Sequence, residues 1–340
     1  MIRRHKVVAI LAGLVGLLLA AVVGFGVYLN AQLGDIARFD SRLQPQQRAP
    51  QPEGTAAEAR NILLLGTDRG NGASIQAELA DGDWSPGAFR SDTIMVVHIP
   101  AEHDRAYLVS LPRDSYVAIP GHGRQKINAA FSYGGPDLAV RTVENLTGIY
   151  IDHITMIDWA GFKDLTRALG GVEVTVADTF TDTRNDRTWR KGTYNLQGTK
   201  ALQYVRTRYG LAEGDLDRIK RQQNFLRAVM AKTISRNTLA NPIKLTNLLG
   251  AITDATTVDS AFTPAEMRRI ALQLRDLGPS DVEFLTTPIR GYATRGDAGD
   301  VVLLQRKETR ALWRSIRNDN IDNYLTTYGG ETLPEADQIR

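Results

Sequence analysis

The chain has 340 residues, enough for one large domain or two small ones. Hydrophobic residues make up 43% of it and charged residues 23%, so a sizeable core can form. The formal net charge of +3 is too small to indicate nucleic-acid binding. The absence of cysteine excludes a disulfide framework, a thiolate zinc site and a cysteine nucleophile.

The N-terminus predicts a membrane anchor. Arg3, Arg4 and Lys6 precede residues 7–29, which contain no charged side chain. As a helix this run would be about 35 Å long, enough to cross a hydrocarbon core of roughly 30 Å. Basic residues before the run, and none directly after it, predict that residues 1–6 are cytoplasmic and that the rest of the chain lies outside the cell membrane. A cleavable signal peptide is the alternative, although its apolar region would normally be about 7–15 residues.

A polar segment follows the anchor. Residues 30–59 are rich in Gln, Pro, Ala and Glu, which is typical of a spacer and not of a core element. We therefore predict a folded domain over residues 60–330 and a disordered tail over residues 331–340.

Within the domain, short apolar runs alternate with helical patterns. The runs expected as buried strands are residues 61–65, 93–99, 106–111, 153–157, 172–176 and 282–286. The expected helices are a stretch from Pro136 to Gly148, preceded by a Gly134-Gly135 turn, and residues 159–169, 215–235 and 306–317. In the helix over 215–235, the spacing predicts a buried side with Leu216, Ile219, Leu226 and Met230. This alternation predicts an α/β domain layered around a mixed sheet.

Two carboxylates stand at expected strand ends. Asp68 follows the run 61–65, and Asp92 precedes the run 93–99. Ligands gather at strand ends in α/β sheets, and two carboxylates brought together there repel each other unless a cation lies between them. Oxygen-only ligation favours a hard ion such as Mg²⁺. The alternative is that each residue only forms a turn or a cap, a common role of Asp.

Basic residues cluster beside the same strand ends. The candidate anion-binding residues are these basic residues and one glutamine: Arg69, Arg90, Arg113, Lys126, Arg206, Arg208, Arg218, Arg221 and Gln222. Because Arg218, Arg221 and Gln222 have helical spacing, they share one face of the helix that begins near Asp215. Guanidinium groups at a helix N-terminus suit a diphosphate. A solvated basic face, with Glu213 and Asp215 as its partners, is the alternative.

Six ordered motifs resemble those of the LytR-CpsA-Psr family. They are NILLLGTDRG, FRSDTIMVVHI, LVSLPRDS, KINAAFSYGG, ITMIDWAGFKDLTRALGGVEV and LQGTKALQYVRTR…GDLDRIKRQQ, and they cover roughly residues 60–235. The resemblance implies an α/β/α sandwich around a central mixed sheet, with an apolar tunnel for an isoprenoid tail. It also implies a phosphotransferase that moves a glycopolymer, such as teichoic acid or arabinogalactan, from a polyprenyl-diphosphate carrier onto peptidoglycan.

The same resemblance implies residue roles. Asp68 and Asp92 match the positions that bind Mg²⁺, with Mn²⁺ as a possible substitute. Positions that hold the diphosphate, or lie near it, are matched by Arg90, Arg113, Arg206, Arg208, Arg218, Arg221 and Gln222. We expect Asp68, Arg113 and Arg206 to act in catalysis, with Asp68 as the base that accepts the proton of the incoming sugar hydroxyl.

Two other functions stay open. A hydrolase that releases polymer or phosphate from the same lipid diphosphate would need the same binding residues. A non-catalytic polyprenyl-phosphate-binding or regulatory membrane protein is the third possibility. The loop between Asp68 and Arg90, which contains Trp84 and is long for the family, is a candidate gate or glycan contact.

Overall fold

The computed structural model describes residues 28, 30–69, 75, 78, 79, 84–207, 210, 214–233 and 241–339, without the side chains of Asp68, Arg69 and Pro242. The predicted anchor, residues 7–29, lies outside this part of the chain except for Tyr28. Among the described residues, no helix is both long and apolar enough to span a bilayer.

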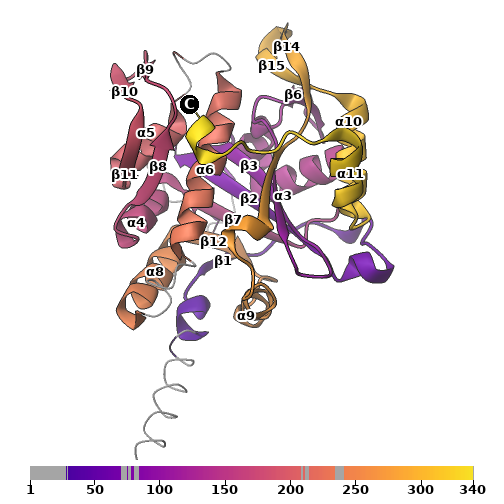
Figure 1. The fold of residues 1–340 in the computed structure, drawn as a ribbon. Helices are drawn as coiled ribbons and strands as arrows, with labels where there is room; N and C mark the ends of the chain where they lie inside the picture. Colours follow the sequence, from indigo (N-terminus) through magenta and orange to yellow (C-terminus); the bar gives the residue numbers. More distant parts are fainter. Residues whose placement is uncertain are drawn as a thin grey trace, which may run out of the picture.

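A seven-stranded mixed sheet forms the centre of the molecule (Figure 1). Its strands, in spatial order, are β1 (Ala37–Phe39), β12 (Thr256–Asp259), β7 (His153–Asp158), β2 (Arg60–Arg69), β3 (Phe89–Ile99), β4 (Ala106–Ser110) and β13 (Val282–Thr286). The pairs β1–β12, β7–β2 and β4–β13 are parallel, and the other three pairs are antiparallel. The apolar runs of β2, β3 and β4 suit central strands that are covered on both faces. The predicted α/β fold around a mixed sheet is confirmed.

Helices cover both faces of this sheet, which makes three layers (Figure 1). One face packs against α3 (Asn128–Thr147), α10 (Arg306–Arg317) and α11 (Ile321–Tyr328). The other is covered by α4 (Trp159–Ala168), α6 (Asp215–Thr233) and α8 (Pro242–Ala255), and α5 (Gly198–Arg206) packs on α4 and α6. Helix α9 (Pro264–Gln273) packs near β12 through a third, smaller cluster.

Four two-stranded units surround the central sheet. They are β5 (Tyr116–Ile119) with β6 (Gly123–Lys126), β8 (Val172–Val176) with β11 (Gly192–Leu196), β9 (Phe180–Asp182) with β10 (Arg187–Trp189), and β14 (Ile289–Arg295) with β15 (Gly299–Leu304). The predicted strand at residues 172–176 is therefore correct in its bounds but lies outside the main sheet.

Strands β2 and β3 extend beyond the apolar runs that predicted them. β2 continues to Arg69, and β3 already begins at Phe89. Asp68 and Asp92 therefore lie inside strands, whereas the sequence placed them just outside. Antiparallel pairing continues over these polar residues, with Asp68 opposite Arg90, and so keeps both strands extended.

Helix α3 begins at Asn128, well before its predicted start at Pro136. Gly134 and Gly135 have non-helical backbone angles, and Gly135 has a φ of 63°, so the expected turn is a kink within the helix. The helix ends as predicted at Gly148, whose φ of 71° is the left-handed cap geometry that glycine favours.

The kink anchors the loop before β3. Because the helix is interrupted there, the carbonyl of Ser132 is available to accept hydrogen bonds from the Trp84 indole and the Gly87 amide, each at 3.0 Å. The Trp84 ring also packs edge-on against Phe131, with ring centroids 5.1 Å apart. A Cβ at Gly135 would lie only 3.0 Å from the Trp84 ring, so this close approach requires glycine.

Helix α6 begins at Asp215, as predicted, but its burial differs from the prediction. Ile219 is buried, whereas Leu216, Leu226 and Met230 are only half-buried. Several polar side chains of the same helix are buried instead, because α5 and β8 also pack against it.

The predicted spacer is part of the folded domain. Ile36 and Phe39 are buried, and β1 pairs with β12 at one edge of the central sheet. Arg48 donates to the buried carboxylate of Glu144, with Nη2 and Oε1 2.8 Å apart. Two apolar side chains and one buried ion pair thus join residues 30–59 to the domain, and the predicted boundary at residue 60 is corrected.

The expectation of a disordered tail is also corrected. Residues 331–339 are ordered, with the Leu333 amide donating to the carbonyl of Phe284 at 2.9 Å. The carbonyl of Ile339 accepts from the amide of Ala177 at 3.0 Å, and the Ile339 side chain is buried. These backbone hydrogen bonds hold the tail in a segment whose composition alone suggested disorder.

Candidate active site

A β-bulge in β3 positions Asp92. The pairing between β2 and β3 runs Gly66 with Thr93 and then Thr67 with Ser91, so Asp92 is an extra residue without an opposite partner. Bulges of this kind redirect a side chain and are common beside active sites.

The bulge reverses which side of the sheet each residue faces. Phe89 and Ile94 both belong to the core on the α3 side, although regular alternation would place them on opposite faces. Asp92 and Thr93, although adjacent, both line cavities on the side of α4 and α6. The bulge thus brings a carboxylate to the face where the basic residues lie.

Arg113, just after β4, is the centre of a carboxylate cluster. Its Nη1 donates to Asp92 Oδ1, and its Nε lies 3.7 Å from Asp114 Oδ2 and 3.8 Å from Asp215 Oδ1. Burial lowers the pKa of Arg113, but the charges of Asp92, Asp114 and Asp215 more than offset this and raise the pKa above its usual value. Arg113 is therefore held in place and positively charged.

Arg218 on α6 joins the same cluster. Its Nη2 lies 2.8 Å from Asp215 Oδ1, and burial holds the pKa of Arg218 below its usual value. The Nε atoms of both Arg113 and Arg218 are buried and have no hydrogen-bond partner among the described residues. An unmet buried donor costs about 1–3 kcal/mol, so an oxygen-rich ligand here would satisfy groups that the fold leaves unmet.

Two adjoining polar cavities surround this cluster. The inner polar cavity has a volume of about 360 Å³, and the outer polar cavity about 550 Å³. Asp92, Arg113, Arg184 and Arg206 line both of them. The basic residues along their walls are Arg90, Arg113, Lys126, Arg184, Arg206 and Arg218, and the acidic ones are Asp92, Asp114, Asp182 and Asp297. The excess of basic residues suits an anion.

An apolar cavity adjoins the inner polar cavity. Its volume is about 110 Å³, and its walls come from β2, β3, α4 and α6, with residues such as Leu64, Phe162 and Val229. Trp159 and Gln222 line both cavities. The Arg206 guanidinium lies over the Trp159 ring, 5.4 Å from its centroid. Charged and apolar surfaces thus meet at this one indole.

The structure brings together most of the predicted diphosphate residues. Those that line the polar cavities are Arg90, Arg113, Lys126, Arg206, Arg218 and Gln222. Arg208 and the side chains of Asp68 and Arg69 lie outside the described part of the chain. Gln222 also donates to the carbonyl of Val205 at 3.3 Å, which fixes its amide near the end of α5.

Arg221 lies away from the cavity walls. It is fully buried, its Nη2 donates to the carbonyl of Thr207, and its guanidinium lies 5.1 Å from the Phe180 ring centroid. Burial lowers its pKa to about 10, while Tyr204 and Asp217 act in the opposite direction. This placement favours a structural role, in which Arg221 holds the chain that follows Arg206, over the predicted ligand contact.

Sequence reasoning missed Arg184 and Asp114 as site residues. Arg184 lies between β9 and β10, and its local pattern signalled only a turn. The Asp182 carboxylate stabilises that turn by accepting hydrogen bonds from the backbone amides of Arg184 and Asn185. Asp114 follows Arg113 directly, and this adjacency in the PRDS motif could have indicated it.

Of the two predicted metal ligands, only the side chain of Asp92 belongs to the described residues, and its Oδ1 already accepts from Arg113. No group of three or more His, Cys, Asp or Glu side chains gathers as a metal site in the part of the chain that the structure describes. Asp92 nevertheless offers a carboxylate on the wall of both polar cavities, and oxygen ligands suit Mg²⁺. The predicted pair of Asp68 and Asp92 stays a prediction.

The fold and the cavities define a three-layer α/β protein in which an arginine-rich polar site adjoins an apolar cavity. The family model described as LytR_cpsA_psr family matches residues 27–318. The chain therefore belongs to the LytR-CpsA-Psr family, and the predicted membership is confirmed.

Named relatives agree with this assignment. The chain is 36% identical over 281 residues to "Probable cell wall biosynthesis protein LcpB" of Corynebacterium glutamicum, covering 82% of this chain but only 66% of that protein. It is 36% identical over 276 residues to "Polyisoprenyl-teichoic acid–peptidoglycan teichoic acid transferase TagU" of Enterococcus faecalis, covering 81% and 85%. The crystal structure of protein gbs0355 from Streptococcus agalactiae superposes with a TM-score of 0.65 at 25% identity, covering 80% and 91%.

Proposed function

We propose that this protein transfers a glycopolymer from a polyprenyl-diphosphate carrier onto peptidoglycan through a phosphodiester link. The observation that carries the proposal is the contact between the polar and apolar cavities at Trp159 and Gln222. A lipid diphosphate has an anionic head joined to an apolar tail, and these two cavities offer matching surfaces side by side. The printed name of the Enterococcus faecalis relative describes a transfer of the same kind.

In the reaction we propose, a hydroxyl oxygen of peptidoglycan attacks the phosphorus that carries the glycan. A P–O bond forms to the acceptor, the P–O bond to the lipid phosphate breaks, and the hydroxyl proton passes to a base. The products are a phosphodiester-linked glycan and polyprenyl phosphate. Negative charge builds on the phosphoryl and leaving oxygens, so groups that offset this charge lower the barrier.

Arg113, Arg206 and Arg218 are the groups best placed to offset that charge. All three line the inner polar cavity, and the buried Nε donors of Arg113 and Arg218 suit phosphate oxygens. Asp68 is the proposed base, and Asp68 with Asp92 would hold Mg²⁺ or Mn²⁺. Such an ion, when bound, would neutralise part of the diphosphate charge.

The apolar cavity would receive the first part of the isoprenoid chain. Its volume of about 110 Å³ is below the range of about 300–1,000 Å³ that ligand pockets occupy, and is less than a complete polyprenyl tail needs. We therefore infer that the half-buried side chains of Leu226 and Val229, which line the cavity from α6, change position when the lipid binds, while Gln223 keeps the helix joined to the sheet.

We also propose that the domain works outside the cell membrane, anchored by residues 7–29. The support is the uncharged run itself and the basic residues Arg3, Arg4 and Lys6 before it. A lipid-linked donor and the wall acceptor meet on that side of the membrane.

The decisive experiment supplies the full chain, in detergent, with lipid-diphosphate-linked glycan and Mg²⁺, in the presence or absence of peptidoglycan. We expect glycan to become covalently attached to peptidoglycan, with polyprenyl phosphate released in step. Arg113→Ala should lower the rate about 100-fold or more, since removing one transition-state donor typically costs about 100- to 1,000-fold. Arg268→Ala, an exposed arginine on α9, is the matched control and should leave the rate unchanged.

Three outcomes would contradict the proposed reaction or its site. Release of free polymer at the same rate without peptidoglycan would identify a lipid-diphosphate hydrolase. Saturable binding of the lipid without turnover would identify a non-catalytic binding protein. A fully active Arg113→Ala protein would overturn the assignment of the site.

A further inference from the structure

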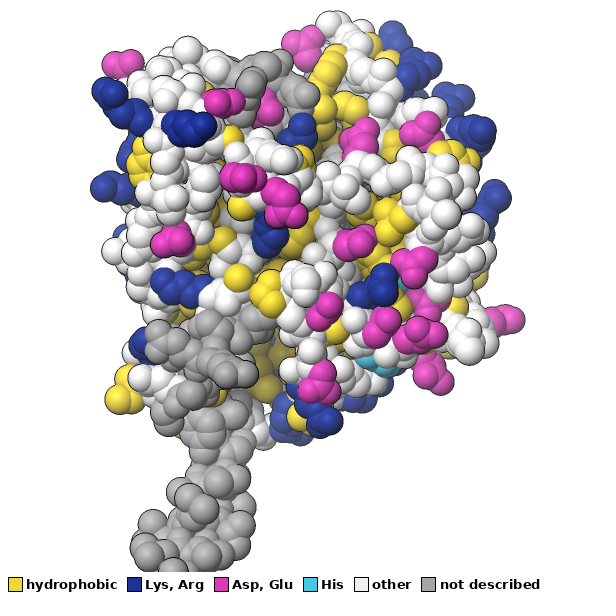
Figure 2. Space-filling view, in the orientation of Figure 1, with side chains coloured by type: hydrophobic (Ala, Val, Ile, Leu, Met, Phe, Trp, Pro, Cys, Tyr) yellow, Lys and Arg dark blue, Asp and Glu magenta, His cyan; other side chains and the backbone are white. Residues whose placement is uncertain are grey.

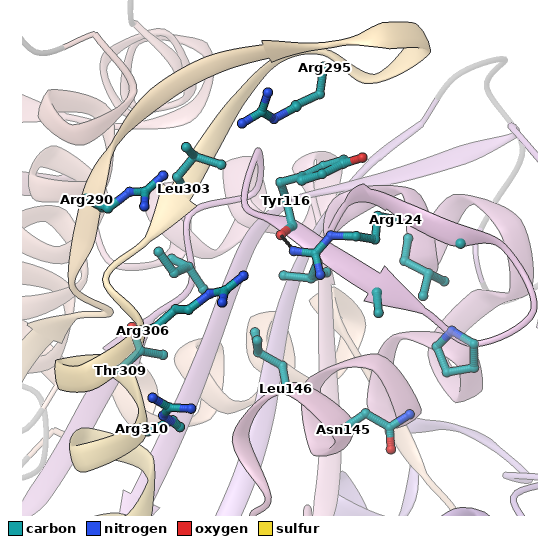
Figure 3. Close-up of a pocket in the computed structure, with 16 residues that line it drawn as sticks. Tyr116, Arg124, Asn145, Leu146, Arg290, Arg295, Leu303, Arg306, Thr309 and Arg310 are labelled. Atoms are coloured by element: carbon teal, nitrogen blue, oxygen red, sulfur yellow. Dashed lines mark hydrogen bonds between the residues drawn. The ribbon is translucent and has the colours of Figure 1, made fainter.

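A second basic depression, which we call the arginine groove, lies beyond the polar cavities. It has a volume of about 790 Å³, within the range of about 300–1,000 Å³ that ligand pockets occupy. Five arginines from three elements line it: Arg124 from β6, Arg290 and Arg295 from β14, and Arg306 and Arg310 from α10. Figure 3 shows Arg124 and Arg306 reaching into the same space from opposite walls.

Among the residues that the structure describes, no acidic side chain lines this groove. All five arginines are exposed, and none forms an ion pair with a carboxylate in the described part of the chain. Five positive charges in one groove repel each other, so an anion bound between them is favoured.

Positive charges are held together on α10 without local compensation. Arg306 and Arg310 are four residues apart on the helix, a spacing at which like charges repel each other. The single acidic residue of α10, Glu308, instead faces α11, where it adds to burial in raising the pKa of Tyr324 to about 12. A bound anion would relieve the repulsion between the two arginines.

The opposite wall of the groove is also fixed. Arg124 donates to the carbonyl of Tyr116 at 3.0 Å, and its guanidinium lies 5.0 Å from the centroid of the Tyr116 ring. Val117 and Ile119 of β5 and Leu303 of β15 add an apolar floor. A groove with arginines at its rim and apolar surface beneath suits a chain that alternates sugar rings with charged groups.

The groove continues the path that begins at the apolar cavity. Two hairpins contribute residues both to the groove and to the outer polar cavity. In β6, Arg124 lines the groove and Lys126 lines the outer polar cavity. At the end of β14, Arg295 lines the groove, and Asp297 just after it lines the outer polar cavity. The amide of Val302 in β15 also donates to the carbonyl of Asp114 at 2.8 Å. The order in space is therefore apolar cavity, inner polar cavity, outer polar cavity and arginine groove. Lys and Arg side chains also gather at this edge of the molecule, over β14–β15 and α10, in Figure 2.

We propose that the arginine groove binds the anionic polymer of the donor, some sugar units away from the diphosphate. This inference rests on the proposed function, because it takes the polymer to be joined to a diphosphate in the polar cavities. The ligand class is a glycan or polyol chain with phosphate groups spaced along it, so that two or more phosphates meet arginines at once. The groove would hold the polymer in line while the diphosphate reacts.

The binding test uses the full chain in detergent and a lipid-free glycerol-phosphate oligomer, measured by calorimetry. We expect the double variant R306Q/R310Q to weaken binding about tenfold or more, and R290Q/R295Q on the facing wall to do the same. The control R268Q/R275Q removes two exposed arginines at the α9 end and should bind like the wild type. All three variants replace exposed side chains, and thermal unfolding will show whether each remains folded.

Three results of this test would overturn the proposal. They are equal binding by groove and control variants, equal binding of a neutral dextran of the same length, and binding of soluble peptidoglycan fragments in preference to the phosphate oligomer. The last result would assign the groove to the acceptor.

A transfer test separates this inference from the proposed function. Donors with a long phosphate-bearing polymer should lose about tenfold in kcat/KM with R306Q/R310Q, whereas donors with only one or two sugars on the diphosphate should be unaffected. An equal loss with both donors would overturn the groove proposal. If no donor supports transfer in the wild type, the proposed function fails, and the binding test still decides the groove.

Discussion

The two faces of the central sheet are packed in different ways. On the α3 and α10 side, large side chains such as Leu63, Val96 and Trp313 are completely buried in one continuous core. On the α4 and α6 side, Leu226 and Val229 are half-buried and border an apolar cavity. Both faces belong to the same strands, so the difference arises from the helices above them.

Hydrogen bonds, and not only apolar packing, attach α6 to its face. The Gln223 amide donates to Ser110 Oγ at 2.9 Å and to the carbonyl of Leu285 at 2.8 Å, so the middle of α6 is joined to β4 and β13. Directional contacts of this kind fix a helix at a point and leave space beside it. The comparison teaches that the α3 face supplies stability, while the α6 face keeps room for a ligand.

The largest effect should follow from removing the Trp313 side chain on the α3 face of the sheet. Trp313→Ala should lower the free energy of unfolding by about 3–5 kcal/mol, because it opens a large cavity in a close-packed core. Leu226→Ala on the other face should cost about 1 kcal/mol, since that side chain is only half-buried and loses less packing. Chemical denaturation of the purified protein measures both values.

A conservative control sharpens this comparison. The Trp313 indole nitrogen has no hydrogen-bond partner among the described residues, so Trp313→Phe should retain most of the stability. Equal losses for Trp313→Ala and Leu226→Ala would show that the two faces do not differ in the way we describe.

An intermediate effect should follow from filling the apolar cavity. Val229→Trp places an indole where the isoprenoid chain is proposed to enter, and should raise the KM for a long-tailed donor by about tenfold or more. A donor with a short, water-soluble tail should be affected much less. Val229→Ala, which enlarges the cavity, is the matched control, and a Val229→Trp enzyme that handles both donors normally would place the tail elsewhere.

The smallest effect concerns Asp319 and the dependence of the free energy of unfolding on pH in the acid range. Burial disfavours the charged form of Asp319, but hydrogen bonds from the His98 ring (3.1 Å) and the Ala101 amide (3.0 Å) outweigh it and lower the pKa of Asp319. A lowered pKa contributes stability that is present above about pH 4, the unfolded value, and is lost as the pH falls through the folded value.

Asp319→Asn should therefore weaken the loss of stability on acidification below about pH 4, and also lower the stability at neutral pH. Unfolding midpoints measured across this range test the expectation. Asp104→Asn, which changes an exposed carboxylate, should leave the acid profile unchanged. An unchanged profile in Asp319→Asn as well would mean that other carboxylates account for the acid dependence.

The pattern of apolar residues was enough to predict the bounds of helices and strands that are determined by their own sequence. The helix Arg306–Arg317 and the strands Val172–Val176 and Val282–Thr286 have the predicted bounds. In each of them apolar periodicity or a short apolar run coincides with the structural element. Gly148 likewise marks a helix end, because its left-handed backbone is a local property.

Features that depend on distant partners were not predictable. The bulge at Asp92 arises from the register of β3 against β2, which no pattern in either strand reveals. Ile36 and Phe39 join the core only because β12, far along the chain, forms the strand beside them. The place of Arg184 at the polar cavities depends in the same way on how the β9–β10 hairpin packs against α5.

The C-terminal segment has a consequence for solubility. β13 is the last strand of the central sheet, and residues 331–333 pair with it, with an isolated bridge between Leu285 and Thr332, before the tail continues to β8. An uncovered edge strand offers unpaired amides and carbonyls to another molecule and promotes aggregation. The tail thus shields the sheet, and a protein shortened after Gly330 would be prone to self-association through β13.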